Sequence, residues 1–226
     1  MRRIDARALL AAMAGLLFIL AVWFYAMGWT PSRDKYPVQG VAITSDAGDV
    51  QWPTAQSAGV DFAYLRATYG VTGRDAGFAT YWANSRTAKV RRGAWHAYSL
   101  CQSADAQANN FVAAVPREKV ALAPAIRLDF MDDCPARPGK AAVLDEIRLL
   151  VKAVEQQSGK PAILWISANF DDVYGVSAEI KRELWLDNGF FQPNYGARGW
   201  AIWRASDRRR VDGMQGSVAW NVVHPH

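Results

Sequence analysis

Short apolar runs alternate with longer amphipathic stretches along most of the chain. The short runs are rich in Val, Ile, Leu and aromatic residues and have the length of buried strands, whereas the longer stretches repeat apolar positions every three or four residues. Strands are predicted over Val38–Ile43, Val60–Ala67, Arg91–Tyr98, Leu122–Asp129, Pro161–Ser167, Leu184–Asp187, Gly199–Trp203 and Ser217–Val223. Helices are predicted over Asp75–Lys89, Ala104–Val115 and Ala141–Gln157.

This alternation predicts an α/β fold with a mostly parallel sheet. About eight strands, with the helices concentrated in the first two thirds, indicate a closed but irregular β/α (TIM-like) barrel over residues 39–226. Barrels of this kind carry their chemistry at the carboxyl ends of the strands. His96 lies within a predicted strand, where a packed or hydrogen-bonded core histidine is expected rather than a ligand.

The N-terminal part has a different pattern. Ala8 to Trp29 form 22 residues without a formal charge, which as a helix would span about 33 Å and cross a bilayer. Residues 1–29 are therefore predicted to be a membrane anchor, and residues 30–38 a polar linker with two prolines. Arg2, Arg3 and Arg7 precede the run and favour a cytoplasmic N-terminus, with the barrel outside the inner membrane. A cleaved signal peptide is the alternative, and the barrel is exported in either case.

Composition narrows the function classes. The chain is 51% hydrophobic and 21% charged, which excludes intrinsic disorder. Its net charge of +5 includes the run Arg208-Arg209-Arg210. This run is interpreted as a solvated loop or, alternatively, as a contact for anionic polymers or lipids. No basic stripe with interleaved aromatics indicates nucleic-acid binding. Two Cys and three His are too few for structural zinc, and neither a metal nor another cofactor is expected.

The two cysteines are expected to pair. Cys101 and Cys134 follow the third and fourth predicted strands, which would be neighbours in the barrel. In an oxidising compartment an even pair of cysteines favours a disulfide, and two free buried thiols are the alternative.

Six segments in order resemble the glycoside hydrolase family 25 lysozymes, the Chalaropsis-type N-acetylmuramidases. They are Gly59–Thr68, Gly93–Tyr98, Asp105–Phe111, Leu122–Ile126, Ile163–Ser167 and Gly199–Trp203. The resemblance covers about residues 39–223. It implies an irregular β/α barrel directed at peptidoglycan, where such enzymes cleave the β-1,4 bond between N-acetylmuramic acid and N-acetylglucosamine.

The acidic positions of that family are altered in this chain. Ala42 stands where the family's first strand carries Asp, and Arg127 and Asp129 stand where its fourth strand carries Asp-x-Glu. Ala219 replaces the acid of the last strand. Tyr69 replaces the Glu that ends the second strand, and Arg204 replaces the Gln of the closing Trp-Gln pair. Only Asp129 remains as a candidate catalytic carboxylate.

Charge and length both make Asp129 a poor general acid. Residues 127 and 129 face the same side of a strand, so the guanidinium of Arg127 would lower the pKa of Asp129. Glycoside hydrolysis needs one carboxyl group that stays protonated. Asp is also one methylene shorter than Glu. The sequence thus predicts an exported, catalytically impaired family 25 domain that binds glycan or a wall-assembly partner.

Two other functions stay open at this stage. One is an active muramidase that uses Asp129 as its carboxylate. The alternative role of Asp129 is a structural salt bridge. The other is an interaction module without sugar affinity, whose arginines contact an acidic protein partner. For glycan binding the candidate residues are Trp95, Tyr98, Trp165 and Trp203, since flat aromatic faces stack on sugar rings; packing inside the barrel is the alternative.

Overall fold

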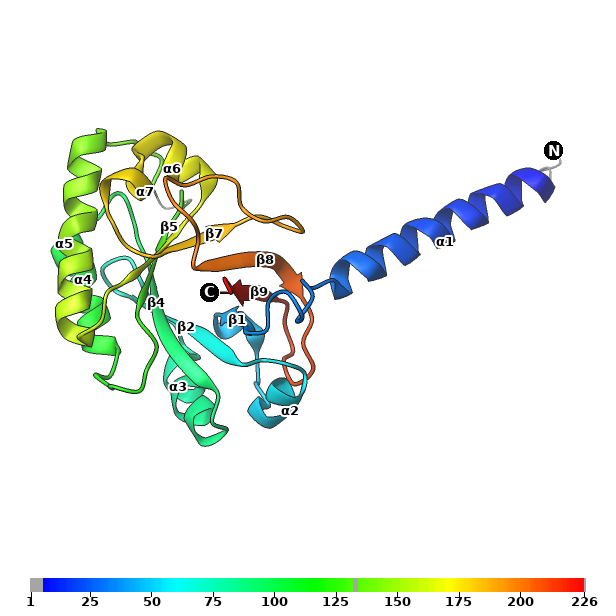
Figure 1. The fold of residues 1–226 in the computed structure, drawn as a ribbon, viewed down its shortest axis with the longest axis horizontal. Helices are drawn as coiled ribbons and strands as arrows, with labels where there is room; N and C mark the ends of the chain where they lie inside the picture. The colour runs from blue at the N-terminus through cyan, green and yellow to red at the C-terminus, as the bar shows by residue number, and fades with distance from the viewer. Residues whose placement is uncertain (1–5, 132–133, 226) are drawn as a thin grey trace.

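Eight strands close into a barrel in the computed structural model, which describes residues 6–131 and 134–225 (Figure 1). Around the ring the order is β1-β9-β8-β7-β6-β5-β4-β2, and β2 pairs with β1 to close it. Neighbouring strands run parallel except β9, which is antiparallel to both β1 and β8. The predicted fold class is confirmed.

The strands have the following bounds. They are Gln39–Ile43 (β1), Phe62–Tyr69 (β2), Gly73–Arg74 (β3, which pairs with the end of β2), Arg91–Ala97 (β4), Ala125–Leu128 (β5), Ile163–Ile166 (β6), Leu184–Asp187 (β7), Ile202–Arg209 (β8) and Val218–Val223 (β9).

The largest difference from the predicted strands is at β8. The prediction covered Gly199–Trp203, whereas the strand begins at Ile202 and continues to Arg209. Its second half is polar and largely exposed, so the hydrophobic pattern ends before the strand does. Antiparallel pairing with β9, interrupted by register shifts, sustains this extension as far as Arg209 opposite Val218. The β8–β9 pair therefore continues past Arg204, where β8 last pairs with β7.

The helices lie on the outside of the barrel, except the N-terminal one, which extends away from it (Figure 1). Their bounds are Ala6–Gly28 (α1), Trp52–Ser57 (α2), Phe78–Thr87 (α3), Ala104–Ala114 (α4), Lys140–Ser158 (α5), Ala168–Tyr174 (α6) and Val176–Glu179 (α7), with a 3-10 turn at Ser45–Ala47. The three predicted helices correspond to α3, α4 and α5. Helices α6 and α7 were not predicted and lie beyond the region where helices were expected. With seven and four residues, they are too short to show a 3.6-residue period.

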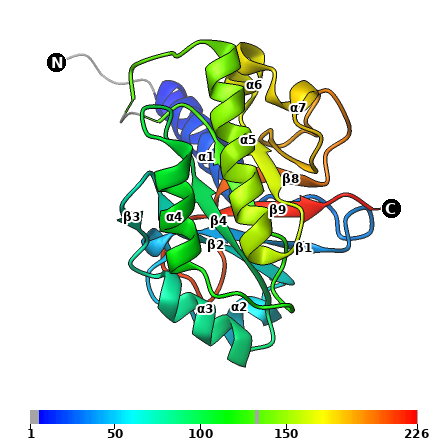
Figure 2. The same ribbon diagram turned by 90° about the vertical axis from the view of Figure 1, so that its left-hand side faces the viewer.

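Helix α5 shows why the long helices could be predicted. Its apolar positions recur on one face and all of them are buried; they are Val143, Ile147, Leu150, Val151 and Val154. Gly159 ends the helix in the left-handed conformation, with φ of 71°. Figure 2 shows α4 and α5 side by side along the outer surface of the barrel.

The core has two layers, one inside the barrel and one between the barrel and the helices. Large aromatic side chains fill the inner layer, among them Phe62, Tyr64, Trp165 and Trp185. The outer layer is larger and includes the buried faces of α4 and α5. Strands buried on both faces read as nearly continuous apolar runs, which explains the pattern of the sequence.

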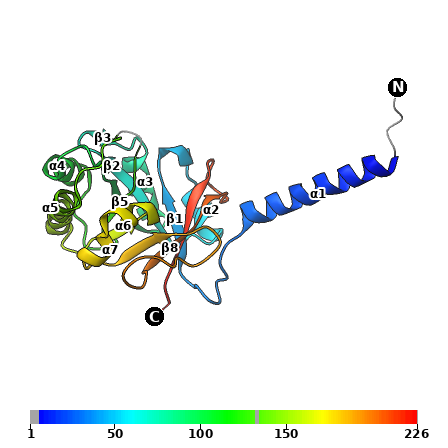
Figure 3. The same ribbon diagram turned by 90° about the horizontal axis from the view of Figure 1, so that it is seen from above.

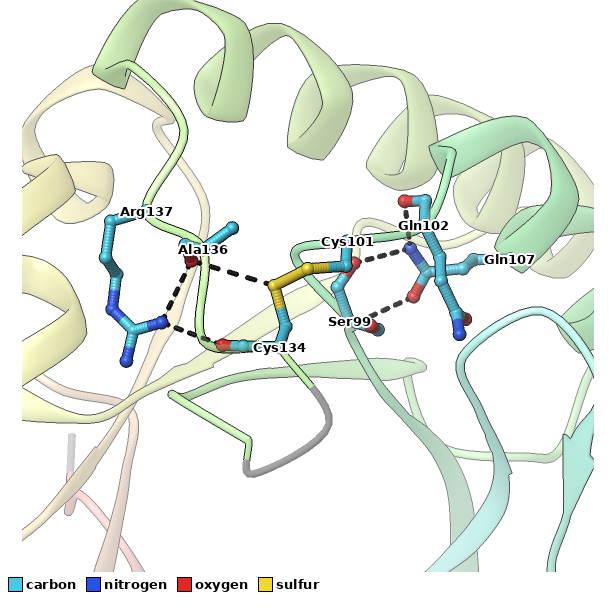
Figure 4. Close-up of a disulfide and its surroundings, with 7 residues drawn as sticks. All are labelled: Ser99, Cys101, Gln102, Gln107, Cys134, Ala136 and Arg137. Atoms are coloured by element: carbon cyan, nitrogen blue, oxygen red, sulfur yellow. Dashed lines mark hydrogen bonds between the residues drawn. A yellow bond between two sulfur atoms is a disulfide. The ribbon is translucent and has the colours of Figure 1, made fainter.

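The disulfide between Cys101 and Cys134 is present, with 5.5 Å between the Cα atoms (Figure 4). It joins the segments that follow the neighbouring strands β4 and β5, as expected. Arg137 donates to the carbonyl oxygens of Cys134 and Ala136 at 2.8 and 2.9 Å. The cross-link thus joins the two segments at the end of the barrel where the carboxyl ends of these strands lie.

Helix α1 projects away from the barrel (Figure 3). Within it, residues 10–28 have a mean hydropathy of 2.2 and no buried side chains, so this span is long and apolar enough to cross a membrane. Arg2 and Arg3, which carry much of the predicted orientation, lie outside the described residues.

The segment of residues 30–38, predicted as a linker, lies against the barrel. The side-chain nitrogen of Gln39 donates to the carbonyl oxygens of Pro31 and Tyr36, both at 2.9 Å. Arg33 forms an ion pair with Asp61 at 3.0 Å, and the Tyr36 side chain is buried. These contacts hold the chain between α1 and β1 on the surface of the barrel.

Candidate functional site

Four strands bring charged and aromatic side chains together at one side of the barrel mouth. Arg127 of β5 lies in register with Trp165 of β6. Asp187, the last residue of β7, pairs with Arg204 of β8. Arg127, Trp165 and Asp187 lie at or near the carboxyl ends of their strands, where barrel enzymes place their functional groups. Arg204 lies at the same level because it pairs with the last residue of β7.

Arg127 is the centre of an ion-pair network. One terminal nitrogen of its guanidinium donates to Asp129 at 2.5 Å, and the other donates to Asp187. Asp187 also accepts from Arg204 at 2.9 Å and from the indole nitrogen of Trp165 at 2.6 Å. Two arginines and two aspartates thus neutralise each other in a largely buried cluster, which we call the Arg127 clamp (Arg127, Asp129, Asp187 and Arg204).

Aromatic rings of the inner layer pack against the clamp. The guanidinium carbon of Arg127 lies 4.6 Å from the centre of the Trp165 ring, a cation–π distance. The opposite face of Trp165 stacks on Trp185, with 4.0 Å between ring centres and 4° between planes. Both faces of the Trp165 ring are therefore occupied within the protein.

The clamp keeps Asp129 ionised. Partial burial raises the pKa of Asp129, but the Arg127 guanidinium, the Ser167 side chain and the backbone N–H of Phe130 together lower it below its usual range. Burial likewise lowers the pKa of Arg127, yet Asp187 and Asp129 outweigh that effect and raise it. Asp129 is therefore an anion and Arg127 a cation at neutral pH, as the sequence predicted for this pair.

Across the mouth the expected acidic positions are apolar. Ala42 of β1 lies directly opposite Ala219 of β9 in the antiparallel register. Ala42 belongs to the inner aromatic layer and is 6% exposed, and Ala219 packs against that layer. No carboxylate faces the clamp from these two positions.

A second ion pair lies near the end of β2. Arg66 contacts Asp75 at 2.9 Å, and the Asp75 carboxylate also accepts from the backbone N–H of Ser45 at 3.1 Å. The Arg66 guanidinium lies 5.1 Å from the ring centre of Tyr69. Tyr69 is 43% exposed, so its ring offers a flat surface at the mouth that the buried tryptophans lack.

The four aromatic residues predicted for glycan binding are divided between the two layers of the core. Trp95 and Trp165 belong to the inner layer, and their ring centres are 5.3 Å apart. Tyr98 and Trp203 belong to the outer layer, on the other side of the sheet. All four are at most 7% exposed, so packing accounts for their positions in this structure.

Two residues of this site were missed or undervalued at the sequence level. Asp187 ends a predicted strand, and an acid at the carboxyl end of a barrel strand was the available signal for it. Tyr69 was noted as a substituted position but not as a binding surface. Because strand order in space decides which ends face each other, the link between Asp187 and Arg127 could not be read from their separation of 60 residues.

His96 is a structural residue. Its ring lies between Thr68 at 2.7 Å and Gln107 at 3.1 Å and is fully buried. Burial lowers its pKa to about 4, although the hydrogen bond to Gln107 acts in the opposite direction. In the described part of the chain, no three His, Cys, Asp or Glu side chains gather as a metal site.

A cavity of about 1520 Å³ opens at the other end of the barrel. Residues at the amino ends of the strands line it, including Phe62, Ile163 and Ile202. It is thus separate from the Arg127 clamp, and it contains none of the groups that the sequence singled out.

The family model described as glycosyl hydrolases family 25 matches residues 41–214, which is most of the barrel. The chain belongs to this family. Among solved structures, the family 25 glycosyl hydrolase from Bacillus anthracis is 27% identical, with a TM-score of 0.79 over 87% of this chain and 93% of the other. A bacterial lysozyme from Streptomyces coelicolor shares the fold, with 23% identity and a TM-score of 0.76 over 83% and 92% of the two chains.

Curated relatives agree with the family 25 membership. The protein YegX of Escherichia coli K12 is 25% identical over 197 residues, which cover 84% of this chain and 71% of YegX. Lysozyme M1 of Streptomyces globisporus is 37% identical over 79 residues, or 34% of this chain and 27% of that lysozyme. The barrel that carries the Arg127 clamp in this chain is therefore a family 25 barrel.

Proposed function

We propose that this protein is a membrane-anchored family 25 domain that binds peptidoglycan glycan outside the inner membrane and hydrolyses it poorly or not at all. The observation that carries the proposal is Arg127, which occupies the mouth and engages both Asp129 and Asp187. A general acid must hold a proton before it can donate it to the leaving oxygen, and a guanidinium at 2.5 Å favours loss of that proton.

Binding does not require a protonated acid, and the exposed ring of Tyr69 supplies a platform for a sugar. The test is sedimentation of the full-length protein, in detergent micelles, with purified peptidoglycan sacculi. Tyr69→Ala should weaken binding about fivefold, the scale of one aromatic stacking contact of about 1 kcal/mol. Phe191→Ala removes another exposed ring, in the loop after β7, and should leave binding unchanged. Equal binding by all three proteins would contradict the Tyr69 platform.

One observation favours a second candidate, an active muramidase. Asp187 is a second carboxylate at the mouth, and two carboxylates are the usual requirement for glycoside hydrolysis. A substrate that displaced Arg127 would leave Asp129 and Asp187 facing it.

A reducing-end assay on peptidoglycan separates the two candidates. If hydrolysis is impaired, the wild type and the Asp129→Asn and Asp187→Asn variants should give the same flat trace at high enzyme loading. Release of reducing ends by the wild type, abolished in either variant, would establish the muramidase instead.

The anchor is tested independently of the site. Helix α1 should retain the full-length protein in the membrane pellet after carbonate extraction, and protease added outside spheroplasts should digest the barrel. Recovery of the barrel in the soluble fraction, without residues 1–29, would indicate a cleaved signal peptide.

A further inference from the structure

The end of the proposed anchor is joined to the barrel beside the clamp. Arg209, the last residue of β8, donates from its guanidinium to the carbonyl oxygen of Gly28, the last residue of α1. The next residue, Trp29, lies with its ring centre 5.1 Å from that of Phe190 and 6.4 Å from that of Trp203. Figure 1 shows the end of β8 next to the base of α1.

Two phenylalanines are exposed at this junction. Phe190 is 41% exposed and Phe191 is 73% exposed, in the loop that follows β7. Phe190 has a φ of 67°, a backbone conformation that bulky residues rarely adopt. The backbone N–H of Phe190 donates to the carbonyl oxygen of Ala205, so the loop is fixed to β8. The fold therefore holds an apolar tip in water at a cost in backbone strain.

Positive charge lies on the same edge. Arg208 and Arg210 are exposed on either side of Arg209. Asp207 pairs with Arg208 at 3.0 Å, with both side chains 55% exposed, so residues 207–210 retain a net positive charge. Exposed aromatic rings beside arginines are the composition of surfaces that bind the interface of anionic membranes.

Resting on the proposed anchor, we infer that Phe190, Phe191 and Arg208–Arg210 form a second membrane contact, in which the phenylalanine loop enters the headgroup region of an anionic bilayer. We call this set the membrane seat. If α1 ends at the bilayer surface, Gly28 and its partner Arg209 are at headgroup depth. The loop around Phe190 lies against Trp29 at the same level. The seat would fix the orientation of the barrel as well as its distance from the bilayer.

The seat also places the mouth close to the bilayer. Asp187 of the Arg127 clamp precedes Phe190 by three residues, and Arg204 precedes Arg208 by four. The backbone N–H of Asn188 donates to the carbonyl oxygen of Arg204, which ties the two strand ends together. The ligand of the mouth is therefore glycan that lies next to the membrane surface.

Spin labels on the full-length protein in vesicles test the seat. One label is placed at a cysteine substituted for Phe191, and the control label at a cysteine substituted for Val120. Val120 is 78% exposed and precedes β5, at the opposite end of the barrel. In vesicles that contain phosphatidylglycerol, the label at 191 should collide more with oxygen and less with a water-soluble nickel complex than the label at 120. Equal exposure of both labels to nickel would overturn the inference.

The lipid and charge arms test whether anionic headgroups are the partner. Replacing phosphatidylglycerol by phosphatidylcholine, or introducing Arg208→Glu together with Arg210→Glu, should raise the exposure of label 191 to nickel. Protection that is the same in both lipids and in the charge variant would refute an anionic surface. Carbonate extraction of the same vesicles is carried out first, so that loss of the anchor is distinguished from loss of the seat.

Discussion

At the scale of single residues, the charge of Arg127 decides what the mouth can do. It is 9% exposed, and both of its partners are aspartates. Removing one member of a buried ion pair leaves the others uncompensated, which costs far more than the pair contributes as a whole. Breaking the clamp should therefore be costly, and under the proposed function the same arginine also keeps Asp129 from serving as a general acid.

Arg127→Leu should destabilise the protein by about 3–5 kcal/mol at pH 7, because the partly buried Asp129 would lose its cation and Asp187 would keep only Arg204. Arg127→Leu combined with Asp129→Asn should recover part of that loss, because Asp187 and Arg204 then remain as a paired anion and cation. Urea unfolding of the full-length protein in detergent micelles measures both. The matched control is Arg148→Leu, whose partners on the surface are exposed; it should cost less than about 1 kcal/mol. Similar losses for the two leucine variants would contradict the role of the clamp.

His96 should make the protein sensitive to mild acid. In the unfolded chain a histidine takes up a proton near pH 6.5, whereas burial delays protonation of His96 to about pH 4. Between these values the unfolded state binds more protons, so stability falls as the pH drops from about 6.5 to 4, by up to about 3 kcal/mol. Unfolding midpoints at pH 7, 6 and 5 measure the slope, and His96→Gln should abolish most of it. An unchanged slope in His96→Gln would assign the effect to other groups.

At the scale of elements, local pattern and long-range pairing determined different parts of the structure. Helix α5 could be predicted because its apolar positions recur on one face, and the barrel strands because they form short, nearly continuous apolar runs. The polar half of β8 could not, because beyond Arg204 only its pairing with β9 holds the chain in a strand as far as Arg209. The same limit applies to the site: Arg127 of β5 and Asp129, which directly follows that strand, are two residues apart and were linked from sequence, whereas Asp187 joins them only through the closed barrel.

The disulfide also acts at the scale of elements, since it connects the segments after β4 and β5. Replacing Cys101 and Cys134 together by Ser should lower stability by about 3–4 kcal/mol, the chain-entropy value for a loop closed across 33 positions. A reductant should lower the free energy of unfolding of the wild type by a similar amount and leave that of the double variant unchanged. A wild type that does not respond to reductant would show that the cross-link adds little.

At the scale of the whole molecule, a family 25 barrel is combined with an apolar helix long enough to span a membrane. Length and hydropathy predicted the helix, whereas the alternation of strand and helix patterns predicted the barrel and six short segments its family resemblance. What they did not reveal is how closely the two are joined: residues 30–38 read as a polar linker, yet Gln39, Arg33 and Tyr36 hold them on the barrel. Short-range contacts between a segment and a surface distant in sequence leave no periodic signal.

If the protein is anchored and binds glycan as proposed, this fixed attachment limits the distance from the membrane that the mouth can reach. A barrel on a slack tether would sample wall layers over the full length of its chain, whereas one held at residues 30–38 reaches outward only by its own thickness. Glycan strands deeper in the wall would then be out of range, however well they fit the mouth. Lengthening the segment of residues 30–38, rather than altering the mouth, would then increase the distance from the membrane at which this domain could bind glycan.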